Sequence, residues 1–195
     1  KRCIDVALVL LSLPFVLPFL ALVSLAIVLS DGGSPLFKQE RIGKDGRRFQ
    51  IWKFRSMVVD AESQLDRHLN ENPAAKAEWE NKQKLSYDPR CTAVGRLLRR
   101  TSIDELPQIF NVLSGDMSLV GPRPMLPSQQ ALYPGQAYYK MRPGMTGAWQ
   151  VTSRSTSDFS DRAAYDDQYN TRLTLVQDLS ILARTVGVVL RGTGV

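Results

Sequence analysis

The chain has 195 residues, which is enough for one domain with a substantial hydrophobic core. Its 25 Lys and Arg against 19 Asp and Glu give a net charge of +6, which suits nucleic acid, an anionic membrane face or a phosphorylated substrate as partner. The two cysteines, Cys3 and Cys91, exclude a disulfide framework, and the one histidine, His68, has no partner at ligand spacing for a histidine-based metal site.

The chain opens with an apolar run of 24 residues without a charge, from Val6 to Leu29. By length this run fits a single transmembrane helix. Two features favour a helix that enters the membrane and returns to the same side. Pro14 and Pro18 each remove a backbone hydrogen bond near the middle of the run, which bends or breaks a helix. Basic residues lie on both flanks, so both ends are expected on the cytoplasmic side.

A β-hairpin is expected after this segment. The runs Leu36–Ile42 and Arg47–Phe54 have strand composition, and Lys44–Gly46 between them is a hairpin turn signal. Most of the basic residues in this region are expected to lie against anionic lipid headgroups. Lys53 and Arg55 are instead candidates for a substrate site, because the second strand fixes the direction of their side chains.

Helical segments dominate the rest of the chain. The expected elements are polar helices between Val58 and Leu85 broken at Asn72–Pro73, a short helix at 94–98, a short strand at Ala148–Thr152, a polar loop at 154–159, and helices at Arg162–Thr171 and Leu179–Leu190. The last helix is apolar and is expected either in the core or at the membrane interface. The fold class is therefore α+β, mostly helical, with a small hairpin, in a compact domain seated on the membrane face.

The strongest functional signal is a pair of adjacent acidic residues, Asp104 and Glu105. A helix is expected to begin here, because Ser102 and Glu105 have the spacing of a capping box and Pro107 is tolerated only near a helix start. The free N–H groups and positive dipole at such a helix start keep carboxylates ionised and attract phosphate. Acidic residues at a helix start are usually only caps, so the pair alone does not establish a site.

Arginines accompany this pair in the sequence. Arg99 precedes it, and Arg123 is held between two prolines that keep the chain extended and direct the side chain. Arg142 begins a second rigid turn. Guanidinium groups together with ionised carboxylates indicate phosphate chemistry, because arginine can pair with two phosphate oxygens at once. For Arg142, a structural ion pair with Asp116 or Asp178 is an equal alternative.

Two other functions compete for the same residues. A membrane-anchored module that binds nucleic acid or headgroups would use the basic residues, but the carboxylates of Asp104 and Glu105 would repel a polyanion. A metal-dependent phosphohydrolase would need further Asp or His ligands at fixed spacing, which the sequence lacks. No GxxxxGK[ST] phosphate loop and no GxSxG elbow occurs. The sequence therefore favours an enzyme and argues against nucleic acid as a partner.

Several blocks together resemble the bacterial sugar transferases, which are monotopic polyprenyl-phosphate phosphoglycosyl transferases. In chain order the blocks are residues 1–5, Phe37–Gly43, Lys53–Met57, Arg99–Pro107, Ser118–Pro124 and Arg142–Gly147. The resemblance covers nearly the whole chain, and the order of the blocks makes it far more specific than any one block. One difference lies at Leu17, because many members have serine before the helix-breaking proline.

The resemblance implies transfer of a sugar 1-phosphate from a UDP-sugar to polyprenyl (undecaprenyl) phosphate, which starts exopolysaccharide or O-antigen synthesis. It implies a catalytic Asp-Glu pair, which falls on Asp104 and Glu105, and a Mg²⁺ ion that Glu105 helps to hold. The choice of Asp104 as the nucleophile that forms a covalent intermediate rests mainly on this resemblance. The residues expected to bind substrate phosphates are Arg99, Arg123, Arg142, Lys53 and Arg55.

The same resemblance implies a minimal catalytic unit in two parts. Residues 1–33 would form a re-entrant membrane helix broken at Pro18, with support from Pro14, and residues 34–195 a cytosolic phosphoglycosyl transferase domain. The expected location is the cytoplasmic face of a bacterial inner membrane, in contact with membrane lipid. Which sugar is transferred, which polysaccharide pathway is served and whether the chain forms a homo-oligomer stay open.

Overall fold

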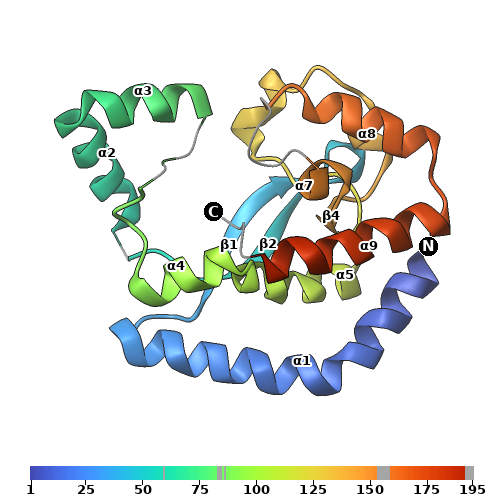
Figure 1. Ribbon diagram of the computed structural model, residues 1–195, viewed down its shortest axis with the longest axis horizontal. Coiled ribbons are helices and arrows are strands. Elements are labelled where there is room, and N and C mark those ends of the chain that lie inside the picture. The colour runs from blue at the N-terminus through green and yellow to red at the C-terminus, as the bar shows by residue number, and fades with distance from the viewer. Residues whose placement is uncertain (59, 83–84, 86, 153–158, 192–195) are drawn as a thin grey trace.

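A computed structural model describes residues 1–58, 60–82, 85, 87–152 and 159–191. The described chain is mostly helical with two small two-stranded sheets, which confirms the expected mostly helical α+β class (Figure 1). The elements are α1 (Arg2–Asp31), β1 (Leu36–Ile42), η1 (Lys44–Gly46), β2 (Arg48–Phe54), α2 (Ala61–Glu71), α3 (Pro73–Lys82), α4 (Ala93–Arg100), η2 (Ile103–Gln108), α5 (Ile109–Ser114), β3 (Ser118–Val120), η3 (Pro127–Leu132), α6 (Ala137–Lys140), β4 (Gly144–Thr146), α7 (Ala148–Thr152), α8 (Arg162–Thr171) and α9 (Leu175–Leu190).

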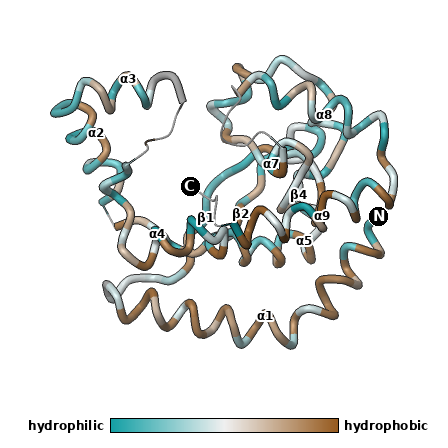
Figure 2. Tube along the Cα trace, viewed as in Figure 1, coloured by the Kyte–Doolittle hydropathy of each residue, from teal (hydrophilic) through white to brown (hydrophobic). Residues whose placement is uncertain are grey.

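The N-terminal segment forms one continuous helix, α1, which runs below the rest of the molecule and is bent (Figure 1). Pro14 and Pro18 lie inside it, as prolines do in bent helices. It is long and apolar enough to cross a membrane, and only 17% of its most apolar window is buried. The side chains of Leu11 and Phe15 are 72% and 81% exposed, and the helix is apolar along most of its length (Figure 2). This exposed apolar surface indicates association with a membrane.

Both ends of α1 are attached to the same domain. Near its start, Arg2 donates a hydrogen bond to the carbonyl oxygen of Leu113 (Nη2–O 2.9 Å). One turn later, Asp5 accepts a hydrogen bond from the hydroxyl of Ser118 (2.7 Å). Towards the other end, Ile27 is 2% exposed and belongs to the main hydrophobic core. The helix therefore lies along the domain instead of leading away from it.

The hairpin is confirmed, with its turn at the expected residues. Strands β1 and β2 are antiparallel, with Leu36 opposite Phe54 and Ile42 opposite Arg48. The intervening turn contains Asp45 with a left-handed φ of 57°. The inner side chains of the hairpin, such as Ile51 and Phe54, enter the main core, and β2 packs against η2.

The side chain of Asn111 joins α5 to the free edge of β2. Its Oδ1 accepts a hydrogen bond from the backbone N–H of Trp52 (2.9 Å), and its Nδ2 donates to the carbonyl of Gln50 (2.8 Å). Asn111 is only 2% exposed, so both bonds are protected from water. This pair of bonds fixes the hairpin against the segment that carries the acidic pair.

Strands β3 and β4 form the second sheet and are parallel. The short strand expected at Ala148–Thr152 was wrong, because these residues form helix α7. The extended segment ends instead at Gly147, where a Cβ atom would lie 2.1 Å from the carbonyl oxygen of Gly121. The chain turns at this close approach, and the helix that follows buries Trp149 and Gln150.

The remaining helices agree closely with expectation. The break at Asn72–Pro73 separates α2 from α3, which form an arm that projects from the molecule (Figure 1). Helix α8 covers the expected residues, and α9 begins four residues earlier than expected. Helix α9 leaves an apolar face exposed, with Val176 at 77% and Leu190 at 81%. Most of the loop expected at 154–159 lies outside the described residues.

Candidate active site

The acidic pair lies in a 3-10 helix, η2, and the regular helix α5 begins only at Ile109. The expected capping box is wrong. Ser102 has a left-handed φ of 57°, and its side chain makes no capping hydrogen bond. The physical reason lies in Pro107, which lacks an N–H donor and disfavours α-helical geometry at the residue before it. The pair is thus not at the start of an α-helix.

Glu105 is held by two cations from other parts of the chain. Its Oε1 accepts hydrogen bonds from Lys53 Nζ at 2.9 Å and from Arg123 Nη2 at 3.0 Å. These side chains are 13%, 16% and 23% exposed for Glu105, Lys53 and Arg123. Burial lowers the pKa of Lys53, and Glu105 and Asp104 act in the opposite direction. The structure therefore brings together Lys53 and Arg123 at the acidic pair, as the sequence predicts.

Asp104 is 8% exposed, and its pKa is raised to about 6. Burial is the largest cause and the charge of Glu105 the second, whereas Lys53, Arg99 and Arg123 oppose the shift. The direction is opposite to that expected from a helix start. A carboxylate with this pKa is still mostly ionised at neutral pH.

Arg99 approaches Asp104 from the end of α4. Its Nη1 donates to Cys91 Sγ at 2.9 Å and lies 3.7 Å from the carboxylate of Asp88. Asp88 in turn binds Arg90 through two parallel bonds of 2.8 and 2.7 Å. These contacts hold the Arg99 guanidinium near Asp104. Its positive charge there opposes the rise in the pKa of Asp104.

The other two predicted arginines lie elsewhere. Arg55 follows β2 and lies against the end of α1, since a Cβ atom at Gly33 would be 1.8 Å from Arg55 Nη1. Arg142 donates from Nε to the carbonyl of Gly115 at 2.8 Å and lines a different cavity. Neither residue lines the pocket at Glu105.

This pocket contains polar residues that the sequence did not predict as site residues. It is narrow, and its lining includes Arg41, Lys53, Glu105, Gln108, Arg123 and Gln150. Two atoms of this lining, Arg41 Nε and Gln150 Oε1, are buried without a hydrogen-bond partner in the part of the chain that the structure describes. Such atoms are costly to leave unpaired. A bound ligand with both donors and acceptors would satisfy them.

Positive charge is in excess around the pocket. Burial, followed by repulsion from Arg123, lowers the pKa of Arg41 to about 10 and that of Arg162 to about 9. Arg162 also lies over the rings of Trp149 and Phe159, at 4.1 and 4.5 Å from their centroids. Arg41 belongs to the block Phe37–Gly43, and Gln150 follows the block Arg142–Gly147. Membership of its block was the one signal in the sequence that could have found Arg41, whereas Gln150 lies outside the blocks and had no such signal.

The acidic pair fits a Mg²⁺ ion only together with a phosphate-bearing substrate. Among residues 1–58, 60–82, 85, 87–152 and 159–191, no group of three or more His, Cys, Asp or Glu could hold a metal. Asp104 and Glu105 offer two carboxylates, and Glu105 Oε1 already accepts from two cations. Mg²⁺ commonly takes one or two carboxylates and completes its shell with phosphate and water. The donor set agrees with this pattern.

Comparison with known proteins places the chain in a family. A family model described as bacterial sugar transferase matches residues 1–192. The undecaprenyl-phosphate galactose phosphotransferase of Salmonella typhimurium is 48% identical over 86% of this chain and 36% of its own length. The UDP-galactose-lipid carrier transferase of Erwinia amylovora is 44% identical over all of this chain and 41% of its own. The exopolysaccharide production protein ExoY of Sinorhizobium fredii is 40% identical, with 100% and 87% covered. The chain thus spans about two fifths of the first two relatives and most of the third, and it belongs to the bacterial sugar transferase family.

Proposed function

We propose that this protein is a phosphoglycosyl transferase, which moves a sugar 1-phosphate from a UDP-sugar to undecaprenyl phosphate and releases UMP. The observation that carries the proposal is the buried Asp104–Glu105 pair, surrounded by Lys53, Arg99 and Arg123. Cations close to ionised carboxylates are suited to a reaction in which a carboxylate must approach phosphate. The name of one relative, an exopolysaccharide production protein, agrees with a step of exopolysaccharide synthesis.

The reaction would proceed in two displacements at Asp104. In the first, a carboxylate oxygen of Asp104 attacks the sugar-bearing phosphorus, and the bond to the UMP oxygen breaks. In the second, an oxygen of the lipid phosphate attacks the same phosphorus and releases the carboxylate. The two polyanions then never have to react with each other directly.

The surrounding residues would lower the cost of bringing phosphate to a carboxylate. Arg123 and Lys53 fix the orientation of Glu105 and place positive charge beside the pocket, while Arg99 does so beside Asp104. A Mg²⁺ ion, when bound by Glu105 and substrate oxygens, supplies further charge stabilisation of the transferring phosphoryl group. The unpaired atoms of Arg41 and Gln150 would then bind the donor substrate.

We propose further that residues 1–33 form a re-entrant membrane helix, with residues 34–195 on the cytoplasmic face of the bacterial inner membrane. The attachment of both ends of α1 to one domain supports this arrangement. The bend and the two prolines support it as well. A straight transmembrane helix would carry one of its ends away from that domain.

The reaction is tested by incubating the purified protein with undecaprenyl phosphate and a panel of UDP-sugars, with UMP release as the readout. At least one UDP-sugar is expected to give UMP that depends on both substrates. Absence of UMP with every sugar in the panel, or release that does not require the lipid phosphate over many turnovers, would contradict the proposal.

Arg123→Lys is expected to lower turnover roughly 10- to 100-fold, the effect of losing a charge-assisted hydrogen bond of about 1.5–3 kcal/mol. Lysine keeps the charge but cannot pair with two oxygens at once. The measurement is kcat and KM for the UDP-sugar, with Arg142→Lys as matched control, because Arg142 lies outside the pocket. Equal losses of turnover in Arg123→Lys and Arg142→Lys would contradict a specific role of Arg123 at the pocket.

The membrane arrangement predicts that residues at both ends of α1 are labelled from the same side. Cysteines introduced one at a time at Lys1 and Lys38, in a Cys3→Ser background that keeps the buried Cys91, should react with a membrane-impermeant reagent only when the cytoplasmic face is accessible. Pro18→Ala is expected to straighten the helix and to weaken this pattern. Labelling of the two positions from opposite sides in the parent protein would refute a re-entrant helix.

A further inference from the structure

A second cavity, which shares no lining residue with the pocket at Glu105, lies where the start of α1 meets the C-terminal half of the chain. Lys1, which is paired with Asp178, lines it together with three other cations that the proposed reaction does not use: Lys44, Lys140 and Arg142. Lys44 comes from the hairpin turn η1, and Lys140 from the end of α6, which packs against that turn. The fold therefore brings together like charges that are far apart in the sequence.

These cations have little negative charge of their own to pair with. Neither Lys44 nor Lys140 has an ion pair within the described part of the chain, and Arg142 Nε donates to a backbone carbonyl. Asp5 also lines the cavity, but it accepts hydrogen bonds from Ser118 Oγ (2.7 Å) and from the N–H of Leu119 (3.4 Å). Like charges held together in this way favour an anionic ligand.

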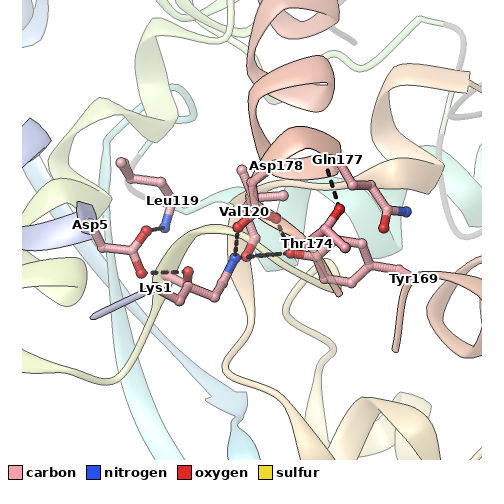
Figure 3. A network of polar contacts seen from close by, with 9 residues as sticks. Lys1, Asp5, Leu119, Val120, Tyr169, Thr174, Gln177 and Asp178 are labelled. Atoms are coloured by element: carbon pink, nitrogen blue, oxygen red, sulfur yellow. Dashed lines mark hydrogen bonds and ion pairs between the residues drawn. The ribbon is translucent and has the colours of Figure 1, made fainter. Parts of the chain in front are cut away.

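The second acidic residue beside the cavity, Asp178, is also already hydrogen-bonded within the protein. Asp178 on α9 accepts from Lys1 Nζ and from Tyr169 OH, each at 2.5 Å (Figure 3). Tyr169 in turn accepts a hydrogen bond from Lys1 at 2.9 Å. This network connects the first residue of the chain to α8 and α9, and it forms one wall of the cavity without neutralising the three cations.

The two helices that this network connects, α1 and α9, both expose apolar side chains near their starts. On the first turns of α1, Leu8 is 40% exposed and Leu11 is 72% exposed. On the first turns of α9, Val176 is 77% exposed and Leu179 is 52% exposed. Leu173, which is 44% exposed, lines the cavity itself and leads into α9. A basic cavity bordered by apolar helix faces matches a phospholipid, which has an anionic headgroup next to its acyl chains.

We infer that this cavity binds the phosphate of an anionic phospholipid headgroup through Lys44, Lys140 and Arg142, with the acyl chains against α1 and the first turns of α9. A free phosphate would use only the charged part of this surface. The apolar borders are the reason to choose the lipid. Lipid binding here would anchor the start of α1.

The test is the binding of dihexanoyl phosphatidylglycerol, below its micellar concentration, to the full chain in a neutral detergent. The double variant Lys44→Gln/Lys140→Gln is expected to raise Kd at least tenfold. Both side chains are exposed, so the fold should be retained. The control Arg67→Gln/Lys76→Gln removes the same charge from the exposed α2–α3 arm and is expected to change Kd less than twofold.

Inorganic phosphate is expected not to displace the lipid at equal concentration, and dihexanoyl phosphatidylcholine to bind at least tenfold more weakly. Equal Kd values for the two double variants would overturn the assignment of the site. Efficient displacement by inorganic phosphate would show a simple anion site and overturn the assignment to a lipid. The readout is lipid binding alone, so neither result depends on the proposed transfer reaction.

Discussion

Asp104→Asn is expected to abolish turnover and to prevent formation of the covalent phosphosugar intermediate. The loss of kcat should be on the order of a thousand-fold or more, because an amide cannot act as the nucleophile of a double displacement. The intact protein, given only a UDP-sugar, should release at most one equivalent of UMP and gain the mass of a hexose phosphate on Asp104. With both substrates it should show ping-pong kinetics.

The measurement is mass spectrometry of the protein and its peptides after incubation with UDP-sugar alone, together with the UMP burst. The expected result for Asp104→Asn is neither mass gain nor burst. Attachment of the sugar phosphate to the variant at the same level would show that another residue is the nucleophile. Failure to detect any attachment to the parent protein would favour direct transfer between the two substrates.

Loss of folding is not expected to explain the effect of Asp104→Asn. Burial raises the pKa of Asp104 to about 6 in the folded protein, above its value of 3.8 in an unfolded chain. Its contribution to stability is therefore most favourable below pH 4 and falls as the pH rises to 6. An uncharged amide avoids this cost, so at pH 8 the variant should unfold at a temperature no lower than the parent does.

Elements with a local cause were predicted well from the sequence. The hairpin turn requires a left-handed residue next to glycine, and Asp45-Gly46 supplies it. The break at Asn72–Pro73 also has a local cause. The prediction of a strand at Ala148–Thr152 was wrong because the alternation of apolar and polar residues in so short a segment fits a helix equally well. The close contact of Gly147 with Gly121, which ends the extended segment, depends on distant residues.

The site was predicted only in part, because it too depends on contacts between residues that are distant in the sequence. The acidic pair and Arg99 lie close together in the sequence, and Lys53 and Arg123 meet them because β2 packs against η2. Arg142 belongs to a block as specific as the others, yet the fold directs it to another cavity. The unpaired atoms that border the pocket became visible only once the chain was folded.

Glu105→Gln is expected to lower turnover at least a hundred-fold and to raise the Mg²⁺ concentration needed for half-maximal activity by 10- to 100-fold, the usual effect of losing support at a metal site. Glutamine keeps an oxygen that can accept from Lys53 and Arg123 but lacks the charge that attracts a divalent cation. Since no capping box exists at Glu105, the loss of a helix cap would not explain a loss of activity in this variant.

The experiment compares Mg²⁺ titrations and thermal unfolding of the parent, Glu105→Gln and Asp116→Asn. Asp116 is an exposed carboxylate bound to Ser114, so its amide variant makes the same chemical change away from the pocket and should behave like the parent. If Glu105 only orients Lys53 and Arg123, its variant will lose activity without any change in the Mg²⁺ requirement. Full activity of the parent in EDTA would exclude the metal altogether. A shifted Mg²⁺ requirement in a variant that still folds would establish Glu105 as the residue through which the metal acts.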